Sequence, residues 1–288
     1  MLGLFGAETF DDLAEGLKEP EYEEWDDNNV SRLHHVLAAR YFDLPERTGG
    51  PSTDDLLRYD GNIVGHTLGI SEKRDERIRW KYFQYLSLLF AEVYLDRYFR
   101  DPDTLLAGLN EHVSLFNEGK AEADQAPDYV PDDLRKLAFW MATGSGKTLL
   151  MHVNVLQYQH YLDLHGRADE LDRIILLTPN EGLSRQHRAE LEKSGFEAEL
   201  FSRSGESLFT SRRIQILEIT KLREDSGVKT VAVEAFEGNN LVLVDEGHRG
   251  TSKASDVVGD KGWKPMRDAL CEGGFSFEYS ATLSLIHI

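Results

Sequence analysis

Residues 141–148 read MATGSGKT and lie between two segments of different pattern. Residues 137–141 (LAFWM) are apolar and have the length of a strand, whereas residues 149–156 begin a largely apolar helix that continues towards Gly166. Glycines between a strand and a helix let successive backbone amides approach phosphate oxygens, and the helix adds its positive dipole end. The sequence therefore predicts a phosphate-binding loop.

The end of this loop has the chemistry that a nucleoside triphosphate and its metal require. The Lys147 ammonium would face the β- and γ-phosphates, and the Thr148 hydroxyl would bind Mg²⁺, which prefers oxygen ligands. The general pattern GxxxxGK[ST] has glycine where this chain has Met141. An accidental glycine turn is the alternative, which the flanking strand and helix disfavour. We expect ATP and Mg²⁺ to bind at Ala142, Thr143, Gly144, Ser145, Gly146, Lys147 and Thr148.

A second motif, LVLVDEGH, occupies residues 241–248. Four apolar residues predict a buried strand, and Asp245 and Glu246 follow at its carboxyl end, where open α/β sheets form ligand sites. In a nucleotide hydrolase Asp245 would hold Mg²⁺, directly or through a water, and Glu246 would orient and deprotonate the attacking water. An acidic pair after a strand is often a solvated loop, but its place about 100 residues after a phosphate-binding loop favours hydrolysis.

The chain from Leu137 onward alternates strand and helix patterns, which is typical of a parallel sheet covered by helices on both faces. Strands are predicted at 137–141, 173–177, 197–201, 213–219, 241–244 and 275–279, and helices after the loop at 181–193, 228–236 and 263–270. We expect this α/β nucleotide-binding domain to occupy residues 135–288.

The preceding residues, 1–134, are expected to form a mainly helical N-terminal region. Apolar periodicity predicts helices at 29–42, 77–99 and 104–116, and the second of these is apolar around most of its circumference, so it should be buried on more than one side. The turn formers of residues 48–54 (TGGPSTD) predict a loop. Residues 100–133 are interpreted as an insertion or connector, with an exposed polar stretch at 117–128.

Composition limits what the surface can bind. The net charge is −19, from 51 acidic and 32 basic residues, so any contact with nucleic acid must be local. Residues 1–60 hold 15 acidic and 5 basic residues. A solvated surface explains this excess, and a regulatory or partner-binding face is the alternative.

The only cysteine, Cys271, excludes an intramolecular disulfide and a cysteine-rich zinc site. Without a signal peptide or a membrane-spanning run, a cytoplasmic protein is expected.

A third motif, SAT at residues 280–282, follows the apolar run FSFEY. In this order MATGSGKT, DEGH and SAT resemble the first motor domain of superfamily 2 helicases, above all the helicase subunit of type III restriction enzymes and the related excision-repair helicase N-terminal domain. The likeness covers about residues 136–284 and implies a RecA-like P-loop fold. That family favours Ala-Thr-Gly-x-Gly-Lys-Thr, which residues 142–148 match, so Met141 fits the family pattern better than the general one.

The resemblance also implies a role for each matching residue. Lys147, Asp245 and Glu246 would carry out ATP hydrolysis. TPNEGLSRQ, at residues 178–186, matches the motif that grips the nucleic-acid backbone. The residues expected to contact nucleic acid, or to link it to the nucleotide, are Thr178, Pro179, Asn180, Thr220, Ser280 and Thr282.

Two of these assignments have structural alternatives. Thr178, Pro179 and Glu181 also fit a capping box with proline at the first helical position, and this interpretation is compatible with nucleic-acid binding. Gln84 follows an aromatic residue in WKYFQYL and is the candidate that would recognise adenine. The alternative is that Gln84 is a surface or helix-packing residue. This alternative is open because Gln84 lies further from Lys147 in the sequence than is usual in the family.

Motors of this family hold ATP between two RecA-like lobes, and the second lobe supplies arginines to the transferring phosphate. The chain ends soon after the third motif, at LSLIHI, which suggests a truncation or read-through. We therefore expect the ATP-binding half of a longer protein, weak or inactive without its second lobe.

The resemblance implies a DNA-dependent ATPase, helicase or translocase of a type III restriction or phage-defence system. Its partners would be DNA or RNA, the second motor lobe, and a modification or nuclease subunit. An ATP-dependent nucleic-acid-binding scaffold that unwinds nothing is the alternative. A P-loop kinase or switch is disfavoured, since neither needs Asp245 and Glu246 together with the SAT step.

Overall fold

The computed structural model describes residues 1–41, 49–74, 76–201, 213–218, 238–245 and 263–281. The chain divides into a helical unit, Met1–Asp96 with His152–Tyr161, and a sheet unit, Arg97–Met151 with Leu162–Ile288. Helices α5 (Tyr82–Arg100) and α7 (Lys147–Leu164) each belong in part to both units. The division into domains at residues 134 and 135 stays a prediction.

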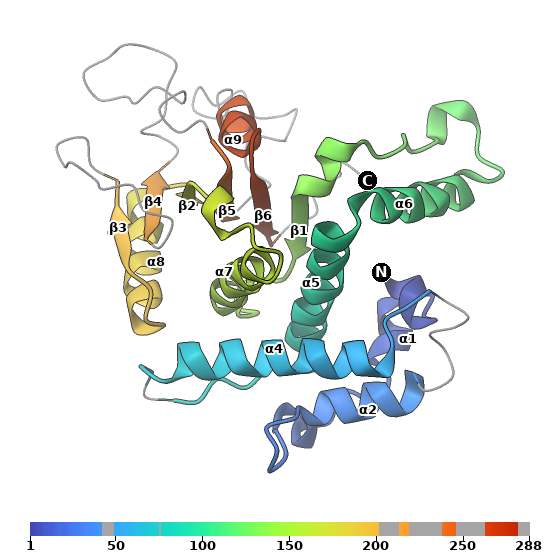
Figure 1. Cartoon of the computed structure of the whole chain (residues 1–288), viewed down its shortest axis with the longest axis horizontal. Coiled ribbons are helices and arrows are strands. Elements are labelled where there is room, and N and C mark those ends of the chain that lie inside the picture. The colour runs from blue at the N-terminus through green and yellow to red at the C-terminus, as the bar shows by residue number, and fades with distance from the viewer. Residues whose placement is uncertain (42–48, 75, 202–212, 219–237, 246–262, 282–288) are drawn as a thin grey trace. The chain divides into compact units, whose positions relative to one another are not determined.

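The sheet unit contains a six-stranded sheet in which every pair of neighbouring strands is parallel (Figure 1). The strand order is β1-β6-β5-β2-β4-β3. The strands are β1 (Lys136–Trp140), β2 (Arg173–Thr178), β3 (Ala198–Leu200), β4 (Ile214–Glu218), β5 (Asn240–Asp245) and β6 (Phe275–Ser280). All six predicted strands are confirmed, with ends that differ by at most one residue.

The central strands of the sheet are apolar and buried along their length. Residues 174–177 of β2 and 241–244 of β5 are at most 1% exposed. Such continuous burial is typical of parallel strands that helices cover. Helix α8 (Glu181–Lys193) packs on β2, β3 and β4, and α9 (Trp263–Cys271) packs on β5. The predicted α/β fold with a parallel sheet is therefore confirmed, and the helix predicted at 228–236 lies outside the described residues.

The connector between α6 (Pro102–Asn117) and β1 is held along that helix by two asparagine side chains. Asn117 donates from Nδ2 to the Ala126 carbonyl and accepts from the Ala126 amide, both at 2.8 Å. Asn110 pairs in the same way with the backbone of Tyr129, at 3.0 and 2.7 Å. The polar stretch predicted at 117–128 is mostly exposed, as expected, but its backbone is fixed to α6 at both ends.

The helical unit contains α1 (Phe10–Ala14), α2 (Arg32–Tyr41), α4 (Thr53–Ser71) and most of α5. Sequence analysis missed α4, and the loop predicted at 48–54 ends at Ser52. The Ser52 hydroxyl accepts from the Asp55 amide, and the Asp55 carboxylate accepts from the Ser52 amide, so a capping box starts the helix. Three glycines weaken its helical pattern: Gly61, Gly65 and Gly69.

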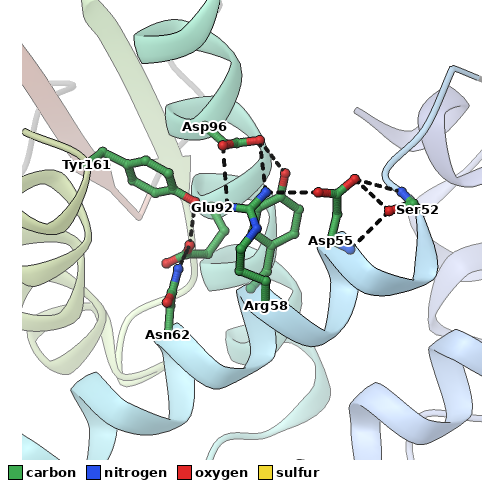
Figure 2. A network of polar contacts seen from close by, with 8 residues as sticks. Ser52, Asp55, Arg58, Asn62, Glu92, Asp96 and Tyr161 are labelled. Atoms are coloured by element: carbon green, nitrogen blue, oxygen red, sulfur yellow. Dashed lines mark hydrogen bonds and ion pairs between the residues drawn. The ribbon is translucent and has the colours of Figure 1, made fainter. Parts of the chain in front are cut away.

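A buried carboxylate, Glu92 of α5, joins three helices of this unit (Figure 2). It accepts hydrogen bonds from Asn62 Nδ2 of α4 at 2.9 Å and from two α7 residues, Gln157 Nε2 at 2.7 Å and Tyr161 OH at 2.8 Å. Burial raises the pKa of Glu92 to about 7, although these three donors act in the opposite direction. The side chain is therefore a polar centre of the contact between these helices.

A second carboxylate of α5, Asp96, continues this network one turn further on (Figure 2). Tyr59 OH donates to it at 2.7 Å, and the Arg58 guanidinium lies 3.3 Å from the same oxygen. Arg58 also contacts Asp55 at 2.9 Å. The acidic side chains of Asp55 and Asp96 are thus used in contacts within and between α4 and α5.

Among the helices that the structure describes, none combines the length and apolar character needed to cross a membrane.

Replacing the buried glutamate should change how stability depends on pH. The folded chain binds the Glu92 proton more tightly than the unfolded chain, so the unfolding free energy should fall as pH rises from about 4.5 to about 7. We expect Glu92→Gln to remove a pH-dependent difference of roughly 3 kcal/mol. Urea unfolding at several pH values measures it. Glu111→Gln, on the exposed side of α6, is the control, and parallel profiles for Glu92→Gln and wild type would contradict the prediction.

Candidate nucleotide-binding site

The loop predicted to bind phosphate connects the end of β1 to the start of α7 at Lys147. Gly144 and Gly146 have φ angles of 76° and 90°, in a region that residues with a Cβ rarely adopt. Residues 142–144 are exposed, and residues 145–149 are half-buried. The amides of Leu149 and Leu150 donate to the Gly146 carbonyl at 3.0 and 3.2 Å, and the positive end of the α7 dipole lies beside the exposed loop, where it favours an anion.

Two contacts hold this loop against the sheet. Met141 donates its amide to the Ser280 carbonyl at 2.9 Å, which extends the β1–β6 pairing by one residue, and its side chain is buried. Lys147 Nζ donates to the Met141 carbonyl at 3.3 Å, so the ammonium lies over the loop. The residue that departs from the general glycine pattern therefore anchors the loop in the core.

The order of the strands brings the second motif to the same edge of the sheet. Trp140 at the end of β1 lies opposite Ser280 of β6, and Tyr279 of β6 lies opposite Asp245 at the end of β5. Because the strands are parallel, their carboxyl ends share one edge. With strands about 4.8 Å apart, the loop and Asp245 are separated by the width of β6, about 10 Å.

Asp245 is held by a residue that sequence analysis missed. His187 of α8 places Nε2 2.9 Å from Asp245 Oδ2, and both side chains are buried. An ionised carboxylate can only accept, so the imidazole Nε2 carries the proton and donates. The nearest signal in the sequence is that His187 directly follows the TPNEGLSRQ motif.

The oxygen atoms at this edge suit Mg²⁺ bound together with a nucleotide. Thr148 is half-buried at the start of α7, and Asp245 ends β5, which is separated from β1 by β6 alone in the strand order. Mg²⁺ usually takes one or two protein oxygens and completes its shell with phosphates and waters. No group of three or more His, Cys, Asp or Glu among the described residues could hold a metal alone. The predicted base, Glu246, lies outside the described residues.

The motif expected to contact nucleic acid begins at the end of β2. Thr178 is fully buried, and its Oγ1 lies 2.6 Å from Ser184 Oγ. Asn180 is the residue that caps α8, because its Oδ1 accepts from the Leu183 amide at 3.0 Å, and it is exposed. The capping box predicted for Thr178 is therefore wrong, and Pro179 precedes the cap. The exposed side chains of this motif are those of Asn180, Glu181, Arg185 and Gln186.

The remaining predicted residues lie in the helical unit or outside the described residues. Gln84 belongs to the helical unit, where its Oε1 accepts from the Lys81 amide at 2.9 Å. That bond helps to start α5 at Tyr82, five residues after the predicted start of the helix. It is the kind of role that the structural alternative expects, and adenine recognition stays a prediction. Thr220 and Thr282 lie outside the described residues.

Comparison with known families agrees with this geometry. A model of the family described as type III restriction enzyme, res subunit, matches residues 108–284. The chain belongs to this family. The match covers more than half of the chain, and it begins inside α6, earlier than the expected residue 136. No curated protein matches the chain significantly.

Family membership confirms the expected kind of domain. The matched region is an N-terminal domain of helicase superfamily 2, which supports a helicase-type ATPase lobe. It contains the loop, Asp245 and Ser280, and also His187. The helicase families use a nucleotide, which agrees with a glycine loop at the start of a helix and a carboxylate two strands away.

Alanine substitutions at two glycines with matching backbone angles test whether the loop binds phosphate. Gly144 has φ of 76° and Gly119, in the connector, has φ of 75°, and a Cβ at either position would meet no atom within 4 Å. Alanine should therefore cost both positions a similar backbone strain, about 1–2 kcal/mol. We expect only Gly144→Ala to weaken binding of a fluorescent ATP analogue, by at least about tenfold. Equal affinities of the two variants would contradict a phosphate-binding role for the loop.

Proposed function

We propose that the chain is the ATP-binding lobe of a nucleic-acid-dependent ATPase, a DNA helicase or translocase of a type III restriction or related phage-defence system. The observation that carries the proposal is the placement of the glycine loop and Asp245 at one edge of the sheet, on either side of β6. Membership of the res subunit family supports the same assignment.

In this proposal the loop amides and Lys147 bind the phosphates of ATP. Thr148 and Asp245 hold Mg²⁺, which neutralises the charge that develops on the phosphate when it is bound. Glu246 directly follows Asp245 in the sequence and orients and deprotonates the attacking water. Arginines for the transferring phosphate would come from a second motor lobe.

Nucleic acid would be contacted at the edge where α8 begins. Asn180 is exposed there, two residues after the end of β2, the strand that pairs with β5. Ser280 supports a link to the nucleotide, because its carbonyl accepts the first amide of the loop. The net charge of −19 favours such a local contact over a broad basic surface. DNA is the proposed track, and the experiment below includes RNA.

Turnover with and without nucleic acid tests the proposal. ATP hydrolysis by the complete protein should be stimulated by one of double-stranded DNA, single-stranded DNA or RNA. Glu246→Gln should keep ATP binding and lose at least about 100-fold of the stimulated rate, as expected for removal of a general base. Lys147→Ala should lose ATP binding as well.

The matched control for the lysine is Lys193→Ala, at the exposed end of α8, where Lys193 pairs with Glu190. It should behave as wild type. ATP binding without stimulated turnover would contradict the motor and would favour the alternative, an ATP-dependent nucleic-acid-binding scaffold without unwinding activity.

A further inference from the structure

The hydrogen bond between α8 and the end of β5 points to a role for a residue outside the recognised motifs. We infer that His187 is a positioning residue that fixes the Asp245 carboxylate for Mg²⁺–nucleotide binding. This inference rests on the proposed function and adds a residue to that site. The bond is 2.9 Å long and joins residues 58 positions apart.

The position of His187 on α8 directs its ring into the protein. The buried residues of this helix are Ser184, His187 and Leu191, which follow the spacing of one helical face. Within this face Ser184 contacts Thr178 of β2, and His187 contacts Asp245 of β5. The imidazole therefore approaches the carboxylate from a helix that is itself fixed on the sheet.

The bond commits one oxygen of the carboxylate to the protein. Nε2 of His187 donates to Asp245 Oδ2, and within the described part of the chain Nδ1 makes no hydrogen bond. A carboxylate held in this way has fewer accessible rotamers, so the bond would fix the direction in which Asp245 meets the metal or a metal-bound water. Groups that orient a metal ligand typically contribute 10–100-fold to metal affinity.

A histidine with only a packing role would not change the affinity of the site for the metal. If His187 only filled space under α8, any side chain that keeps α8 packed would preserve metal binding. If it positions Asp245, the variant must place an N–H where Nε2 lies. Glutamine can do this because its amide nitrogen is as many bonds from Cα as Nε2, whereas the asparagine nitrogen reaches only the position of Nδ1.

The experiment measures Mn²⁺ binding to the complete protein by electron paramagnetic resonance, with a non-hydrolysable ATP analogue present. Mn²⁺ replaces Mg²⁺ as the probe, and no turnover is needed. We expect His187→Ala and His187→Asn to weaken Mn²⁺ affinity by about 10–100-fold. His187→Gln should recover affinity to within about threefold of wild type. Circular dichroism checks that each variant is folded at the temperature of the measurement.

The results separate the inference from the proposed function. Asp245→Asn is the reference for loss of the metal ligand. Normal Mn²⁺ affinity in His187→Ala, together with a loss in Asp245→Asn, would overturn the role of His187 and leave the ATPase proposal intact. Equal affinities of His187→Gln and His187→Asn would also overturn it. Normal affinity in Asp245→Asn would instead contradict the proposed metal site.

Discussion

The backbone hydrogen bonds that pair β6 with β1 on one side and with β5 on the other are the constraint on which the site depends. Parallel pairing aligns the carboxyl ends of all three strands, so the loop after β1 and Asp245 at the end of β5 lie at the same edge of the sheet. The close fit of β6 begins at Gly274, where a side chain would overlap the backbone of Asn240 in β5. Displacement of this one strand would separate the phosphate-binding loop from Asp245.

Most of the sheet could be predicted because its signals are local. The central strands are short apolar runs, and β6 alternates apolar with polar residues, so both patterns are evident from neighbouring residues alone. Helix α4 could not be found in this way, because three exposed glycines dilute its pattern and its capping box resembles a turn. The predicted start of α5 is five residues too early: Ile78 and Trp80 are buried in a non-helical segment, and the helix begins at Tyr82, where the Gln84 side chain accepts from the Lys81 amide.

The candidate site shows the same division between local and distant signals. Lys147, Thr148 and Asp245 belong to short motifs, and their chemistry is implied by residue type and spacing. His187 belongs to no motif, and its bond to Asp245 depends on how α8 packs on the sheet. The buried carboxylates of the helical unit are a similar case. In the sequence Glu92 and Asp96 are charges within an apolar helix, and only the fold brings their donors from α4 and α7.

Helix α7 starts in the phosphate-binding loop and supplies residues His152–Tyr161 to the helical unit. These residues are buried around most of the helix, and Gln157 and Tyr161 bind Glu92 there. One helix therefore contributes residues to both units of the chain. A chain cut at residue 135 would keep the loop but would lose Glu92, the partner of Gln157 and Tyr161 in the middle of α7. Exchange of this region between related proteins would require matching changes along α7.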